Sequence, residues 1–151
     1  MLISIQHDID TFDFQESKYR KGREGHQQPP HRGRWGHTYT GEYKQKRRRK
    51  TLHGKGIMVY CNAESSYVGW WKDNLKDGIG IRRYNDGMVY QGEYKEGKWN
   101  GIGKFTFPDG EYYQGEFKDD QWAGHGMYQD QDGKRYFGTF EAGKKHGVAS
   151  V

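Results

Sequence analysis

The sequence predicts an all-β fold made of tandem β-hairpins, and three observations support this prediction. Tyrosines recur every 23 residues, at Tyr67, Tyr90, Tyr113 and Tyr136, and glycines follow them at fixed offsets. An Asp-Gly pair, which favours a tight turn, closes the units that begin at the first three tyrosines. Aromatic residues make up 16% of the chain and glycine occurs 23 times, so rings packed on glycine must replace the usual aliphatic core.

The glycines define the repeat together with the tyrosines. Two residues after the tyrosines come Gly69, Gly92, Gly115 and Gly138, eleven residues after them come Gly78, Gly101, Gly124 and Gly147, and further glycines follow at Gly80, Gly103 and Gly126. An isolated hairpin is only marginally stable, so each unit must bury its apolar face against its neighbours in the array.

The unit that begins at Tyr90 shows how the pattern specifies a hairpin. Alternation places Tyr90, Gly92 and Tyr94 on one face of a first strand. Gly97 and Asn100 predict the turn, and the glycines and phenylalanines of the following segment share one face of a second strand. A ring can lie flat on a glycine because no Cβ obstructs it. The hairpin therefore has an aromatic-and-glycine face.

The first unit opens at Tyr39 and is longer than the others, because Tyr67 follows it by 28 residues. Most of the extra residues fall between Gly41 and Gly54, where a basic run replaces a short turn. Insertions in repeat arrays map to loops, so we predict an exposed hairpin tip. The basic residues are Lys44, Lys46, Arg47, Arg48, Arg49 and Lys50.

The net charge of +5 is concentrated in this part of the chain. Residues 39–66 carry seven basic and two acidic groups, whereas residues 67–151 carry 12 and 13. The basic run is therefore a candidate contact for an anionic partner such as a lipid surface, RNA or an acidic protein; the alternative is a solvated loop. We do not expect nucleic-acid binding, because repeat packing already accounts for the rings that could stack on bases.

The unit Tyr90-Gln91-Gly92-Glu93, followed by Gly97, Gly101-Ile102-Gly103 and Asp109-Gly110, resembles the MORN (membrane occupation and recognition nexus) repeat. The resemblance extends from Tyr39 to Val151 and implies an elongated, single-layer antiparallel sheet of stacked hairpins. MORN arrays associate through their ends, so the resemblance also implies a homodimer or an end-to-end contact through the C-terminal repeat. Departures from the motif are Trp70, Asn74, Thr139 and Ala149.

The predicted domains are an irregular N-terminal extension and linker, residues 1–38, and the array, residues 39–151. Units start near 39, 67, 90 and 113, and a partial unit starts at 136. Residues 35–38 are interpreted as half of a preceding hairpin, and residues 27–30, which include two prolines, as a linker. The first sixteen residues mix apolar and acidic side chains, which is typical of a tail or of a segment that adds to a partner.

No catalytic, cofactor-binding or metal-binding residues are predicted. The seven histidines and Cys61 lack the spacing of metal ligands, and the glycines before Lys104 belong to the repeat, without the spacing of a phosphate-binding loop. Glu93 and Glu116 occupy equivalent repeat positions, which favours a structural role in the hairpin over acid–base chemistry. We therefore do not expect an enzyme.

These observations favour a non-catalytic scaffold subunit that binds other proteins of a larger cytoskeletal assembly. The family resemblance adds the setting of an axoneme or cilium, as in a radial spoke or a microtubule-associated structure. One alternative is a peripheral membrane adaptor that binds anionic lipids such as phosphoinositides, and another is an accessory subunit of an organellar membrane complex. The N-terminus lacks a targeting pattern and the single cysteine cannot form an internal disulfide, so we expect a cytoplasmic protein.

Overall fold

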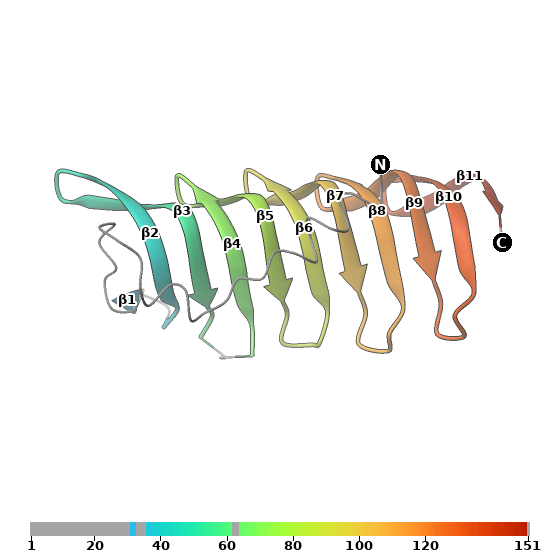
Figure 1. Ribbon diagram of the computed structural model, residues 1–151, viewed down its shortest axis with the longest axis horizontal. Helices are drawn as coiled ribbons and strands as arrows, with labels where there is room; N and C mark the ends of the chain where they lie inside the picture. Colours follow the sequence, from blue (N-terminus) through green and yellow to red (C-terminus); the bar gives the residue numbers. More distant parts are fainter. Residues whose placement is uncertain (1–30, 33–35, 62–63, 151) are drawn as a thin grey trace.

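Eleven antiparallel strands form one sheet in which spatial order follows chain order (Figure 1). The computed structural model describes residues 31–32, 36–61 and 64–150, and the side chains of residues 36–61 and 64–146. The strands are β1 (His31–Arg32), β2 (Thr38–Lys46), β3 (Arg49–Val59), β4 (Ser66–Lys72), β5 (Leu75–Arg83), β6 (Val89–Lys95), β7 (Lys98–Thr106), β8 (Tyr112–Lys118), β9 (Gln121–Gln129), β10 (Arg135–Glu141) and β11 (Lys144–Ser150). Consecutive hairpins extend in a single layer, which confirms the predicted elongated antiparallel sheet.

A row of glycines crosses the sheet from β2 to β10, each paired in register with the next. The row consists of Gly41, Gly56, Gly69, Gly80, Gly92, Gly103, Gly115, Gly126 and Gly138. A Cβ on Gly69 would lie 2.5 Å from the Cα of Gly80, and one on Gly92 would lie 2.4 Å from the Cα of Gly103. At Gly41, Gly69, Gly92 and Gly115 the paired backbone therefore leaves no room for a side chain, and the glycines that follow them in the row, Gly56, Gly80, Gly103 and Gly126, lie under tyrosine rings.

The repeat tyrosines lie over this row. A Cβ on Gly80 would lie 2.5 Å from the ring atom Cε2 of Tyr67, and Gly103 and Gly126 have the same relation to the next two tyrosines. The Tyr67 hydroxyl donates a hydrogen bond of 2.9 Å to the carbonyl oxygen of Trp70. The predicted packing of rings on glycine is therefore present, and its fully buried members are Tyr67, Tyr90 and Tyr113.

A second set of rings, four residues after the tyrosines, links one unit to the next. Tyr94 illustrates the arrangement, because its ring meets Tyr67 of the preceding unit and Tyr90 of its own unit edge to face. The equivalent rings are Trp71, Phe117 and Phe140, and the contacts along the ladder have centroid distances from 4.8 to 5.7 Å. Such pairs contribute about 0.5–1.5 kcal/mol each beyond the burial of area. The ladder therefore makes neighbouring hairpins stabilise one another.

Two tryptophans cover the open sides of the later tyrosines. The Trp99 ring stacks on Tyr90 with centroids 4.9 Å apart, and the Trp122 ring stacks on Tyr113 at 4.5 Å. A single-layer sheet has no opposing layer to bury its rings. The tryptophans supply the missing cover, which explains how these tyrosines are fully buried.

In three of the hairpins a bulge in the second strand is held by a carboxylate from the first strand. In the β6–β7 hairpin the register shifts between Gly92 and Tyr94, and Gly101 adopts a φ of +105°. The Glu93 carboxylate accepts a hydrogen bond from the backbone N–H of Ile102. The same relation is found for Glu42 with Lys55 and for Glu116 with His125. These contacts give Glu93 and Glu116 the structural role that their repeat positions predict.

Short turns lie along one long edge of the sheet and Asp-Gly loops along the other (Figure 1). Both residues have positive φ in the turns Asp73–Asn74, Glu96–Gly97, Asp119–Asp120 and Ala142–Gly143, as in type I′ hairpins. This corrects the predicted turn after Tyr90, because Asn100 lies within β7. On the other edge the Asp86 and Asp109 carboxylates accept hydrogen bonds from backbone N–H groups two residues later, at 3.0 and 2.9 Å.

Two expectations for the N-terminal part of the array were wrong. The basic run does not replace the turn with a loop; it lengthens β2 to 9 residues and β3 to 11, compared with 7 and 9 for β6 and β7. Strand pairing satisfies the backbone groups of the added residues, which a loop would leave to solvent. The strand before β2 is β1 and not residues 35–38, because Gly36 has a φ of +77° and β2 begins at Thr38. Residues 1–30, including the predicted linker, lie outside the described residues.

Candidate functional site

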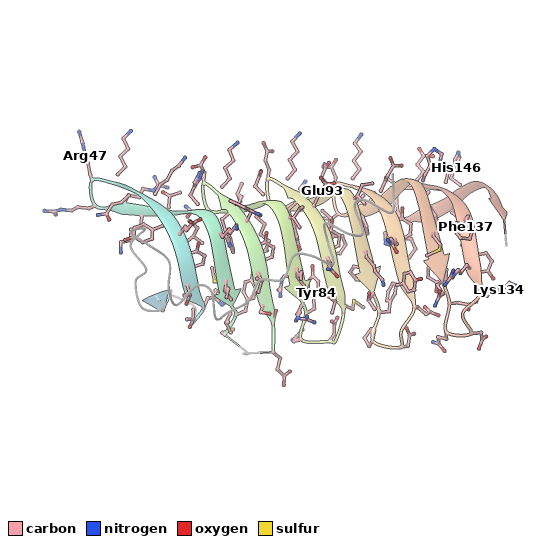
Figure 2. All side chains as sticks on the ribbon, viewed as in Figure 1. Arg47, Tyr84, Glu93, Lys134, Phe137 and His146 are labelled. Carbon is pink, nitrogen blue, oxygen red and sulfur yellow. The ribbon has the colours of Figure 1, made fainter. Side chains whose placement is uncertain are left out.

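The end of the β2–β3 hairpin forms the basic tip, which we define as Lys44, Lys46, Arg47, Arg48, Arg49 and Lys50. β2 and β3 are longer than the corresponding strands of the β6–β7 hairpin. The tip lies at the extreme end of the turn edge, where Arg47 is labelled in Figure 2. All its members are exposed except Lys50, whose ammonium lies 4.6 Å from the centroid of the Tyr43 ring. The predicted exposed position of the basic run is therefore observed.

The register of the tip places several of its polar side chains on one face. Lys46 pairs with Arg49 and Lys44 pairs with Thr51, and alternate residues of a strand share a face. This face borders a cleft of about 600 Å³ between the tip and the turn of the next hairpin. The cleft is lined by Lys46, Arg47, Arg49, Thr51, Asp73 and Asn74. Three cations against one carboxylate favour an anionic group in the cleft.

Backbone contacts fix the next turn against the first hairpin. The Asn74 N–H donates to the carbonyl oxygen of Leu52 at 3.0 Å, and the Leu52 N–H donates to Asn74 Oδ1 at 2.8 Å. The same pair of bonds joins Asp120 to Trp99, at 3.1 and 2.9 Å. The cleft beside the basic tip therefore has one wall that is fixed by hydrogen bonds.

Positive charge is less concentrated at the other tips. Lys72, Lys95 and Lys118 recur along the same edge, but each is followed by acidic turn residues. These acidic residues are Asp73, Glu96, Asp119 and Asp120. The turn edge therefore has one strongly cationic end and not a continuous basic surface.

Within the described residues, β2, which carries Lys44 and Lys46 of the basic tip, is an edge strand over most of its length. β1 pairs only with Thr38 and Tyr39, so within the described part of the chain Thr40–Lys46 has a strand neighbour on the β3 side alone. An unpaired edge offers backbone N–H and C=O groups to another strand. Backbone groups and cationic side chains are thus available side by side.

A second exposed feature, the reverse-face patch, lies on the side of the sheet opposite the tyrosines. It consists of Ile57, Val68, Trp70, Ile79 and Ile81. Ile57, Val68 and Ile81 are neighbours across β3, β4 and β5, and the Trp70 side chain is 38% exposed. Sequence reasoning missed this patch, although the apolar residues on both faces of these strands are a signal for it. It also missed the ladder, although Trp71, Tyr94, Phe117 and Phe140 share the repeat period.

The repeat-defining residues occupy equivalent places until the last unit. Gly78, Gly101 and Gly124 have positive φ at the bulges, and Gly147 lies in β11. Tyr136 is only half-buried, unlike the three tyrosines before it. At the repeat position of Gly80, Gly103 and Gly126, the sequence of the last unit has Ala149.

Burial and hydrogen bonding define the environment of four repeat phenols and of His37. Burial raises the pKa of the Tyr67, Tyr90, Tyr94 and Tyr113 hydroxyls, which keeps them protonated. Among the described side chains no group of three or more His, Cys, Asp or Glu residues could hold a metal ion. His37 Nδ1 instead accepts a hydrogen bond from the Cys61 N–H at 3.1 Å.

Comparison with protein families identifies the repeat. The model for the MORN repeat matches residues 39–63, 67–89, 90–112, 113–135 and 136–149. These boundaries coincide with the units read from the tyrosine spacing. A comparison with curated proteins gave no match. Within the described ranges, no helix is long and apolar enough to span a bilayer.

Proposed function

The chain belongs to the MORN repeat family, and on this premise we propose that it is a non-catalytic scaffold subunit of a larger cytoskeletal assembly. MORN repeats suggest a protein-binding or membrane-associated protein, and the family is generally non-enzymatic. The setting that the resemblance implies is an axonemal or ciliary complex, with the protein in the cytoplasm.

The reverse-face patch is the observation that carries the protein-binding function. The rings of the aromatic face are buried in contacts between hairpins. The opposite face exposes Trp70 beside half-buried aliphatic side chains on three adjacent strands. Contiguous apolar surface of this kind marks protein interaction sites. An elongated array also presents such a surface along a rigid support.

Affinity capture with cross-linking mass spectrometry, from extracts of ciliated cells, tests the proposal. The chain should capture other proteins, with cross-links to β3–β5. Trp70→Glu should remove this capture without unfolding the array, because the first, third and fourth units carry Glu at the same repeat position. Leu75→Glu is the matched control, since Leu75 is 47% exposed but lies at a hairpin tip away from the patch. A chain that captures no protein, or whose capture is lost equally in both variants, contradicts the proposal.

A contact between copies is part of the same proposal. β11 forms the other end of the described sheet and has a strand neighbour only in β10. MORN arrays associate through their ends, so two chains are proposed to meet through the C-terminal repeat. Light scattering of the purified chain should give twice the monomer mass, and a monomer at all concentrations tested would contradict this contact.

The basic tip favours a second candidate function, a peripheral membrane adaptor for anionic lipids. Each basic residue near an anionic bilayer contributes about 1 kcal/mol, so the tip could tether the chain weakly. Flotation with vesicles that contain phosphatidylserine and phosphoinositides tests this function. The triple variant Arg47→Glu, Arg48→Glu, Arg49→Glu should lose flotation, and unchanged or absent flotation would exclude the adaptor.

A further inference from the structure

Within the described residues, the outer side of β2 is open beyond Tyr39. β1 pairs Arg32 with Thr38 and His31 with Tyr39. In the sequence two prolines precede His31, and proline has no N–H to donate to a ladder. Seven residues of β2, Thr40–Lys46, are without a strand on that side in the described chain.

The side chains along this open edge are cationic toward the tip. Lys44 and Lys46 are exposed and lie on the same face of β2, with Arg49 beside Lys46 on β3. Arg47 and Arg48 form the turn at the end of the strand. A strand added to this edge would place alternate side chains beside Lys44 and Lys46, because side chains alternate with the same period in both strands.

An extended peptide fits these features better than a bilayer or RNA. The open backbone groups require a ladder of donors and acceptors, which a peptide in strand conformation supplies. A flat bilayer would favour a continuous basic edge, but the other tips carry acidic turn residues beside their lysines. Lys50, the member of the tip nearest an aromatic ring, already lies over Tyr43, so no open ring is offered to a base there.

We propose that β2 binds an acidic, extended segment of a partner protein as an added strand. Carboxylates at alternate positions of that segment would pair with Lys44 and Lys46, and one end of the segment would meet the arginines of the basic tip. This inference rests on the proposed protein-binding function and names the partner chemistry of one surface. It is separate from the reverse-face patch.

A synthetic probe tests the inference on the full chain. The probe is a fluorescent, end-blocked peptide of alternating Glu and Thr, about eight residues long to match the open part of β2. Its affinity is measured by fluorescence anisotropy, and hydrogen exchange of the β2 amides is followed with and without the probe. Binding should slow exchange in Thr40–Lys46 and leave the interior strands unchanged.

Two chemically altered probes separate strand addition from charge attraction. One is N-methylated on every Glu amide and the other on every Thr amide. Alternate amides of a strand point to opposite edges, so only one of these probes should lose affinity, by about tenfold or more. Equal affinity of both methylated probes and the parent would show that charge alone binds the peptide, and would overturn the inference.

Matched protein variants locate the contact. The double variant Lys44→Glu, Lys46→Glu should weaken binding of the probe by about tenfold or more. The control Lys95→Glu, Lys98→Glu makes the same charge change at an interior hairpin tip and should weaken binding less than about threefold. Equal losses in both variants would assign binding to diffuse charge and overturn the inference. The inference would also be overturned if the chain bound anionic vesicles or RNA more tightly than the probe and the probe could not displace them.

The remaining test asks whether acidic residues of the same chain occupy the open edge of β2. Asp8, Asp10, Asp13 and Glu16 could compete for the same edge. Probe affinity should change little when they are replaced by Asn and Gln, and a gain of about tenfold would assign the edge to this segment and overturn the proposal of an external partner. If the probe does not bind while the unaltered chain still captures proteins from extracts, the scaffold function stands and this inference fails.

Discussion

The ammonium group of Lys76 lies 5.3 Å from the centroid of the Tyr67 ring, at the repeat position where Trp99 and Trp122 stack on the next two tyrosines. Lys145 takes the same position over Tyr136, at 3.7 Å. The array thus covers its tyrosines either with an indole or with a cation, and both interact favourably with the face of a ring.

This equivalence predicts that Trp99→Lys is less damaging than Trp99→Ala. The alanine variant removes a large ring from Tyr90 and should cost about 3 kcal/mol of unfolding free energy. The lysine variant keeps an aliphatic stem and a cation over the ring, as at Lys76, and should cost at least about 1 kcal/mol less. Guanidinium denaturation measures both changes. Equal losses of unfolding free energy in the alanine and lysine variants would contradict the prediction that lysine can replace the indole over Tyr90.

Gly80→Ala should destabilise the array through a clash with Tyr67. The added Cβ would lie 2.4 Å from the Tyr67 hydroxyl oxygen, so we expect a loss of about 1–3 kcal/mol. In a Tyr67→Leu background the same glycine substitution should cost less, because the shorter side chain leaves room for a methyl group. A double-mutant cycle by chemical denaturation measures this coupling, and purely additive losses would argue against the clash.

Because a carboxylate holds the bulge, we expect that removing one lowers stability and that adding one raises it. Glu93→Ala leaves the Ile102 N–H without its acceptor and should cost about 1–2 kcal/mol. The second unit has Trp70 where the first, third and fourth units have Glu. Trp70→Glu should therefore restore the contact to the N–H of Ile79 and raise the unfolding free energy by about 1 kcal/mol. Thermal unfolding of both variants provides the measurement. A destabilised Trp70→Glu chain would be inconsistent with this role of the carboxylate.

Two tyrosine hydroxyls should respond differently to removal. The Tyr90 hydroxyl donates to the carbonyl oxygen of Glu93 at 2.7 Å, so Tyr90→Phe should cost about 1 kcal/mol. The buried Tyr94 hydroxyl has no partner in normal hydrogen-bond geometry within the described chain, and Phe117 and Phe140 fill its position in the next units. Tyr94→Phe should therefore be neutral or stabilising by urea denaturation, and a loss comparable to that of Tyr90→Phe would contradict this.

The array should lose stability in alkaline solution. Burial raises the pKa of the Tyr90 and Tyr113 hydroxyls above the ordinary value of 10.0, and burial with a hydrogen bond to Glu111 raises the pKa of Tyr128 to about 12. Above pH 10 the folded chain then binds more protons than the unfolded chain, so stability decreases as pH rises. The contribution is complete below about pH 10 and disappears as pH passes the raised pKa values.

Denaturation between about pH 8 and pH 12 measures this decrease. Tyr113→Phe is the informative variant, since it removes one titrating hydroxyl and should make the decrease shallower. A profile with the same slope in the variant and in the unaltered chain would show that Tyr113 does not contribute.

Most of the repeat architecture could be predicted from residue spacing. Tyr90, Gly92 and Gly103 lie where alternation places them, and the basic run lies at an exposed hairpin tip as its insertion predicted. The ladder through Tyr94 and the stacking of Trp99 on Tyr90 were not predicted. These contacts join residues of different strands, and alternation along one strand does not fix which residue of the next strand lies opposite.

The sequence by itself determined the period, the hairpins and the face that carries the rings, because these depend on local alternation and on glycine at fixed positions. Only the tertiary structure decided that Glu93 holds a bulge, that the basic run extends two strands instead of forming a loop, and that most of β2 is an open edge within the described residues. Those features depend on the register between strands. Positive-φ glycines such as Gly101 shift this register by bulging the backbone, and periodicity does not reveal the shift.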